Sequence, residues 1–121
     1  MKKWSILLLT LCIAFFSCKK DKTNSRTLRY ELSGTYSGTL FVSYTTASGG
    51  TANDPVTTTW NKEITYASNV TSAIIAISGN GGVPGQKVTV VVKRDGRQLS
   101  STVATADASG SFSKPAPTVI F

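Results

Sequence analysis

The clearest pattern in this chain is a strict alternation of side-chain character over residues 30–45. The even positions carry apolar or aromatic side chains or glycine, and the odd positions carry Ser or Thr except at Glu31 and Phe41. A period of two is typical of a strand with one buried face. Gly34 and Gly38 interrupt the run and predict a bulge or bend where the strand changes partner or sheet.

Further strands are predicted downstream. They comprise an alternating run from Val56 through Trp60 to Ile64 and Tyr66, a continuous apolar run at residues 73–77 suited to a strand covered on both faces, and the β-branched run 88–92. Residues 47–55 have the composition of a loop throughout.

A β-hairpin is predicted at residues 94–97, because Asp95-Gly96 supplies the positive φ angles of a type I′ turn. Its return strand covers residues 98–106, with Leu99 and Val103 expected on the inner face. A turn follows at residues 107–110, and Phe112 and residues 119–121 are expected to close the core. These short strands and turns indicate an all-β fold, a small antiparallel Ig-like β-sandwich of about seven strands over residues 30–121.

The first seventeen residues predict a helical signal peptide that is cleaved. Its apolar run, residues 4–16, follows two lysines and is shorter than the roughly 20 residues that span a bilayer. The sequence Phe15-Phe16-Ser17-Cys18 resembles a lipobox, and Cys18-Lys19-Lys20-Asp21 is similar to the start of Bacteroidota lipoproteins. The resemblance implies fatty acylation of Cys18, with ordinary secretion and a free thiol as the alternative.

The charge distribution argues against nucleic acid as a partner. The chain has 13 Lys and Arg against 6 Asp and Glu, a formal net charge of +7. Residues 1–17 carry +2, residues 18–29 carry +4, and residues 30–121 carry only +1. Residues 18–29 therefore form a basic tether, which lacks apolar periodicity and is expected to be disordered. Its length beyond the cysteine averages roughly 18 Å and reaches about 38 Å when stretched.

The chain lacks residue types that several kinds of reactive site require. The chain has no His, and both cysteines, Cys12 and Cys18, lie in its first eighteen residues. A His general base, a Cys–His pair, a zinc site of the usual ligands and an intradomain disulfide are therefore not expected. Glu31 and Glu63 are interpreted as surface charges, because nothing indicates a cleft between them. We expect no enzymatic activity, no cofactor and no metal.

Four segments carry a resemblance to a known family. They are Tyr30-Glu31-Leu32-Ser33-Gly34, the run 42–49, Trp60-Asn61-Lys62 and the run 88–96. In this order and spacing they resemble the soluble domain of the MmpS family of small membrane-anchored proteins. The resemblance spans about residues 30–121 and implies an Ig-like β-sandwich that works beside RND-type lipid and siderophore exporters. No site residue is carried over from the family, and the fold transfers more safely than the role.

Two features are candidates for partner contact. Phe41 is the one large apolar side chain on the polar face of the first run, and Lys93, Arg94 and Arg97 cluster around the predicted hairpin tip. The alternatives are that the second sheet covers Phe41 and that the hairpin charges are solvated and protect a sheet edge. Trp60 is expected to pack in the core rather than to stack on a ligand.

These features predict a non-catalytic lipoprotein of the bacterial cell envelope, anchored at the outer membrane and facing the periplasm, with the inner membrane as the alternative and the leaflet left open. Its sandwich is expected to act as a protein-interaction or transporter-accessory module. The expected partners are the membrane, through lipid on Cys18, and an envelope protein or exporter; the oligomeric state is open. The alternative is a module that binds glycan or lipid through Trp60, Tyr44 and Phe41 exposed together.

Overall fold

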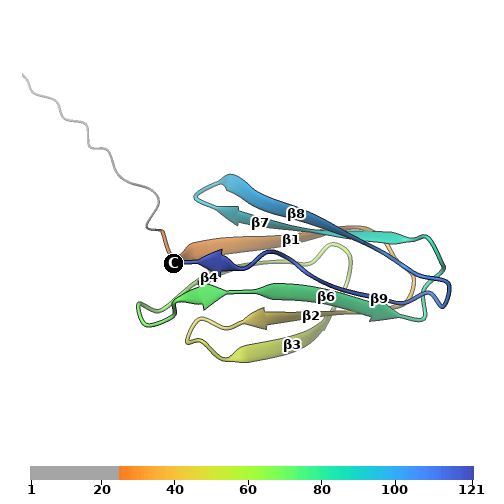
Figure 1. The fold of residues 1–121 in the computed structure, drawn as a ribbon, viewed down its shortest axis with the longest axis horizontal. Coiled ribbons are helices and arrows are strands. Elements are labelled where there is room, and N and C mark those ends of the chain that lie inside the picture. The colour runs from red at the N-terminus through yellow and green to blue at the C-terminus, as the bar shows by residue number, and fades with distance from the viewer. Residues whose placement is uncertain (1–24) are drawn as a thin grey trace, which may run out of the picture.

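A computed structural model describes residues 25–121, which form two antiparallel four-stranded sheets packed face to face (Figure 1). The strands are β1 (Thr27–Thr35), β2 (Thr39–Thr45), β3 (Thr51–Val56), β4 (Asn61–Thr65), β5 (Ser72–Ala73), β6 (Ile75–Asn80), β7 (Lys87–Arg94), β8 (Arg97–Thr105), β9 (Phe112–Pro115) and β10 (Val119–Ile120). One sheet has the order β4-β1-β7-β8 and the other β3-β2-β6-β9, with β10 paired to β5. The predicted all-β antiparallel sandwich is confirmed, with ten strands in the described residues instead of about seven.

The start of the body differs from the expected boundary. The signal peptide, Cys18 and residues 19–24 of the tether lie outside the described residues. Strand β1 begins at Thr27, so residues 27–29, which were expected in the tether, belong to the body. The reason is packing, because Leu28 is fully buried and pairs with β4 and β7 on either side. Residues 25–121 therefore carry eight basic and five acidic side chains.

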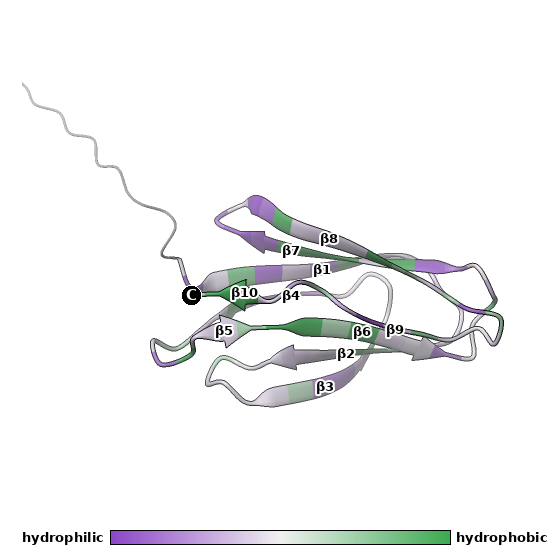
Figure 2. Cartoon of the chain, viewed as in Figure 1, coloured by the Kyte–Doolittle hydropathy of each residue, from purple (hydrophilic) through white to green (hydrophobic). Residues whose placement is uncertain are grey.

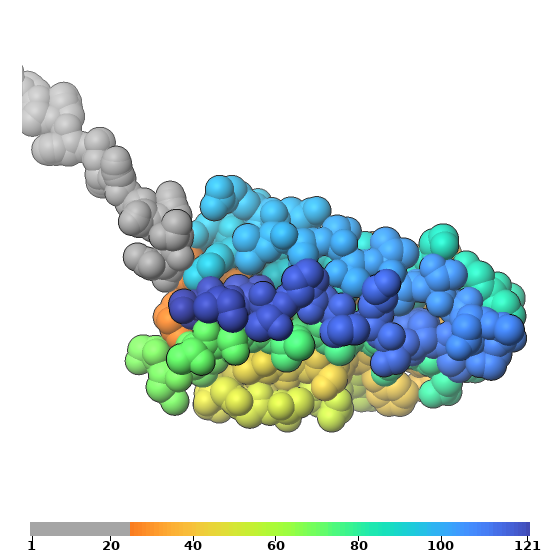
Figure 3. All heavy atoms as spheres, viewed as in Figure 1, coloured from red at the N-terminus to blue at the C-terminus, as the bar shows by residue number. Residues whose placement is uncertain are grey.

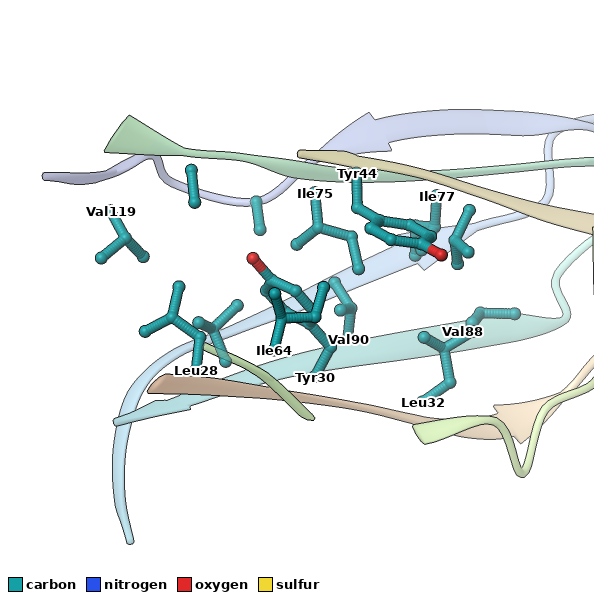
Figure 4. Packing of buried hydrophobic residues seen from close by; sticks show 14 of the residues in the cluster. Leu28, Tyr30, Leu32, Tyr44, Ile64, Ile75, Ile77, Val88, Val90 and Val119 are labelled. Carbon is teal, nitrogen blue, oxygen red and sulfur yellow. The ribbon is translucent and has the colours of Figure 1, made fainter. Parts of the chain in front are cut away.

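The core lies between the two sheets, as the alternation predicts. Inward side chains of both sheets meet there (Figure 4); those of β1, β2 and β7 are Leu28, Tyr30, Leu32, Leu40, Val42, Tyr44, Val88, Val90 and Val92. The predicted change of sheet near Gly34 is confirmed, since β1 and β2 belong to different sheets. Gly34 has a φ of 124°, and a Cβ atom there would collide with the carbonyl oxygen of Lys87. Only glycine fits this position.

The hairpin is confirmed, but its return strand faces the other way. Asp95 and Gly96 have φ angles of 54° and 77°, as a type I′ turn requires. Lys93 then pairs with Gln98 but Val92 pairs with Ser100, so Leu99 is bulged out of the ladder. A shift of one residue turns every later side chain to the opposite face. The prediction that Leu99 and Val103 face inward is therefore wrong; they are 43% and 44% exposed.

Three other local predictions are corrected by the pairing. Residues 51–56 form the edge strand β3 instead of a loop, and Pro55 is tolerated because an edge strand has free positions. The run 73–77 is covered on one face only, since Ile74 is 44% exposed. At the C-terminal strand Val119 closes the core as expected, whereas Ile120 points outward. Figure 2 shows this strand, β10, as an apolar segment at the border of the body.

Candidate functional site

The two long edges of the sandwich differ in how they are closed. On one edge, the connection between β3 and β4 folds Trp60 against the core, with its ring centroid 5.9 Å from that of Tyr44. The Trp60 carbonyl accepts a hydrogen bond of 2.9 Å from the Leu32 amide, which fixes this connection to β1. The predicted packing role of Trp60 is confirmed, and this edge is closed.

The other edge, between β8 and the C-terminal strands, is hollowed. The inward positions of β8 are Ser100, Thr102 and Ala104, which pair with Val92, Val90 and Val88. These side chains are small, so the space between the sheets is incompletely filled along this edge. Figure 3 shows the C-terminal segment lying beside β8 on this side of the molecule. We call this side of the body the open edge.

Two hollows lie along the open edge. One has a volume of about 330 Å³ and lies between Val103 on β8 and Phe112 and Lys114 on β9. The second has a volume of about 230 Å³ and is bordered by Arg94, Leu99 and Ile120. Ser100 borders the second hollow, and its side-chain oxygen is buried without a hydrogen-bond partner within residues 25–121. The open edge thus combines apolar side chains with a few polar groups.

The basic side chains of the hairpin have separate surroundings. Lys93 Nζ lies 3.1 Å from Glu31, which also binds Arg29 Nε at 2.8 Å. The Arg29 and Lys93 hydrogen bonds hold the pKa of Glu31 below its usual value. Arg94 Nε instead donates to the Ser25 carbonyl at 2.7 Å, and Arg97 is exposed. The structure therefore separates Lys93, which is paired with Glu31, from Arg94 and Arg97, which lie opposite each other across the hairpin turn.

The three aromatic rings of the alternative hypothesis do not share a surface. Phe41 is half-buried on the outer face of β2, opposite Pro55 of β3 and Ser78 of β6. Tyr44 points the other way into the core, where Trp60 packs on it. A glycan or lipid module built on these rings together therefore lacks its common face. The second sheet does not cover Phe41 either, so it remains a candidate contact.

A chain of buried hydroxyl groups joins the two sheets, and no sequence pattern indicated it. The Tyr66 hydroxyl donates to the Thr45 carbonyl at 2.6 Å, so Tyr30 is the donor in the 2.8 Å contact between the two tyrosine hydroxyls. Burial is the main cause that raises the pKa of Tyr30 and of Tyr66. Burial and a hydrogen bond to Asp54 raise the pKa of Tyr44 to about 12. These hydroxyls are neutral near pH 7 and act as structural links.

The role of Arg26 was not indicated by any sequence pattern either. Its guanidinium donates to the Ala67 carbonyl at 2.8 Å and to the Val70 carbonyl, and it lies 4.6 Å from the centroid of the Phe121 ring. All these partners are at least forty residues away along the chain, so no local pattern could indicate them. Arg26 thus holds the start of the body against the segment that contains Ala67 and Val70 and against the C-terminal Phe121.

The remaining acidic groups form no reactive cluster in the described part of the chain. The predicted turn after β8 is confirmed, with Asp107 Oδ1 accepting hydrogen bonds from the amides of Ser109 and Ser111. Within residues 25–121, no three His, Cys, Asp or Glu side chains lie close enough to share a metal ion. No helix in this range has the length and apolar character needed to cross a bilayer.

Comparisons with known proteins add no assignment. Protein-family models, curated proteins and solved structures each gave no match to this chain.

Proposed function

We propose that this chain is a lipid-anchored protein of the bacterial cell envelope, held at the outer membrane and facing the periplasm. In this proposal the signal peptide at residues 1–17 is removed, Cys18 is acylated, and the following residues tether a non-catalytic β-sandwich. The sandwich binds another envelope protein. The lipobox-like sequence supports the anchor, and the open edge supports the binding role.

The observation that carries the binding role is the free side of β8. This strand is nine residues long and lies at the end of its sheet, so within residues 25–121 one row of its backbone groups has no strand partner. An extended segment of a partner adds to such an edge through main-chain hydrogen bonds, and pockets beside it select side chains. Val103 and the hollow of about 330 Å³ lie where such side chains would fall.

The class of partner follows from the resemblance to the MmpS family. Proteins of that family work beside RND-type exporters, so an exporter or an associated envelope protein is the partner that we propose. Phe41 lies on the outer face of the other sheet and is a second contact candidate. Val103 lies on β8 and Phe41 on β2, and these strands belong to different sheets. A partner that contacts both residues therefore has to extend around the sandwich.

Site-specific crosslinking in intact cells tests the binding role. A photoreactive side chain at Val103 on β8 is expected to capture an envelope protein, identified by mass spectrometry. The matched control is Lys62, an exposed residue on β4, the opposite edge strand of the same sheet. Capture from Val103 but not from Lys62 supports the proposal. Equal capture from both positions, or none from Val103, contradicts it.

Intact-mass measurement tests the anchor separately. The mature protein is expected to begin at Cys18 and to carry the added mass of a diacylglycerol and an amide-linked acyl chain. The Cys18→Ala variant should lose this mass and leave the membrane fraction. An unmodified, freely soluble mature chain contradicts the lipoprotein assignment.

A further inference from the structure

The described chain begins at one end of the sandwich (Figure 1), and several contacts hold Ser25 and Arg26 there. The Ser25 carbonyl accepts a hydrogen bond of 2.7 Å from Arg94, and the Arg26 carbonyl accepts one of 2.8 Å from the Tyr66 amide. The Arg26 guanidinium and the Arg94 guanidinium both lie against the Phe121 ring, 4.6 and 5.3 Å from its centroid. We call this the entry end; the loop containing Val83 lies at the far end.

The distance from the entry end to the anchor is short. Six residues lie between Cys18 and Ser25, so seven Cα-to-Cα steps join the two. A segment of this length spans about 15 Å on average and at most about 25 Å. Because Ser25 is held by Arg94 on the surface of the body, the entry end is the part of the sandwich nearest to an acylated Cys18.

The surface of the entry end combines basic and apolar side chains. Arg94 and Arg97 flank the hairpin turn on either side of Asp95, and within residues 25–121 neither forms an ion pair with a carboxylate. Leu99 and Ile120 are exposed beside them, Ile120 by 67%, and border the hollow of about 230 Å³. Figure 3 shows that the C-terminal segment reaches this end. Basic groups next to exposed apolar side chains are typical of surfaces that rest on a lipid interface.

The far end has a different composition. Lys87 at the start of β7 and Asp107 in the turn after β8 have formal charges that cancel, and the exposed large apolar side chain at this end is Val83. Gly82 and Gly110 pack directly on each other there, with the Gly82 amide donating to the Gly110 carbonyl at 3.1 Å. The strands that separate the two ends have up to nine residues and are therefore about 30 Å long. The basic and apolar surface is thus specific to the entry end.

We propose that the entry end of the sandwich rests on the anionic phosphate headgroups of the membrane, with Arg97 and Arg94 facing the phosphates and Ile120 and Leu99 at the lipid interface. This inference rests on the proposed lipid anchor and adds an orientation to it. The strands then stand away from the bilayer, and the open edge faces sideways toward a partner in the same membrane. Each basic residue near the surface strengthens this contact about fivefold.

Depth-dependent fluorescence quenching tests the orientation on the mature lipoprotein in vesicles. Single cysteines are introduced as Ile120→Cys or Val83→Cys and labelled with a fluorophore, in phosphatidylcholine vesicles that contain phosphatidylglycerol and a headgroup spin label. Both positions are exposed and apolar, so they form a matched pair at opposite ends. We expect several-fold stronger quenching at position 120 than at position 83.

Charge reversal separates a lipid contact from a merely short tether. Arg97→Glu is expected to reduce quenching at position 120, whereas Lys87→Glu, an equal change at the far end, leaves it unchanged. Omitting phosphatidylglycerol, or raising the salt so that the screening length falls to about 3 Å, should act like Arg97→Glu. Two results overturn the inference for a lipoprotein that still floats with the vesicles. One is equal quenching at both positions, and the other is quenching at position 120 that does not change with Arg97→Glu or with the lipid composition. A chain that does not float overturns the proposed anchor and this orientation with it.

Discussion

The hydroxyl chain that joins the sheets predicts an unequal pair of substitutions. Tyr30 donates to Tyr66, and Tyr66 donates to the Thr45 carbonyl, so the two hydroxyls have different roles. Tyr30→Phe removes one hydrogen bond and leaves no donor without an acceptor. We expect it to lower the free energy of unfolding by about 1 kcal/mol, the net value of a typical hydrogen bond.

Tyr66→Phe is expected to be clearly more harmful. It removes both hydrogen bonds and leaves the hydroxyl of Tyr30, a residue that is only 1% exposed, with no acceptor for its proton. An orphaned buried donor costs about 1–3 kcal/mol, and the lost bond to Thr45 adds about 1 kcal/mol, giving about 2–4 kcal/mol. Adding Tyr30→Phe to this variant deletes the orphaned donor. The second substitution should therefore raise stability in the Tyr66→Phe background, although it lowers stability in the original protein.

Equilibrium urea unfolding followed by circular dichroism measures all four members of this cycle. Tyr36→Phe is the control, because the Tyr36 hydroxyl donates to the Gly110 carbonyl at the far end and makes no hydrogen bond with Tyr30 or Tyr66. Its effect should add to that of Tyr66→Phe within about 0.5 kcal/mol. The assigned donor directions are refuted if Tyr30→Phe is the more costly substitution, or if the two substitutions are simply additive.

Three further predictions concern pH and backbone strain. Burial raises the pKa of Tyr44 to about 12, so the folded state keeps a proton that the unfolded chain releases near pH 10. Stability, measured as the melting temperature at each pH, should therefore fall between about pH 10 and pH 12. Hydrogen bonds from Arg29 and Lys93 lower the pKa of Glu31, so stability should fall as the pH drops through about 4, and Glu31→Gln should flatten that dependence in the same assay. Gly110→Ala should lower the melting temperature much more than Gly81→Ala, because both residues have a φ of 81° but only a Cβ at position 110 would collide with the Gly82 carbonyl. Equal effects of the two alanines would mean that backbone strain alone matters at these positions.

The fold class and much of the core followed from local patterns. The alternation over residues 30–45 identified the inner faces of β1 and β2, because a strand that covers a core must repeat every two residues. Asp95-Gly96 located a hairpin turn, since few other pairs adopt positive φ angles at low cost. Each of these signals depends only on neighbours along the chain.

The candidate surfaces did not follow from such patterns. The open edge exists because the bulge at Leu99 reverses the inward and outward faces of β8. The alternation along one strand does not reveal the register in which it pairs with its neighbour. The entry end exists because Arg26 and Arg94 bind carbonyl groups and an aromatic ring far away along the chain. Local sequence determined most of the strand segments and which faces of β1 and β2 are apolar, although it missed β3. Only tertiary pairing decided which side chains of β8 stay exposed, because register and long-range hydrogen bonds are properties of two segments together.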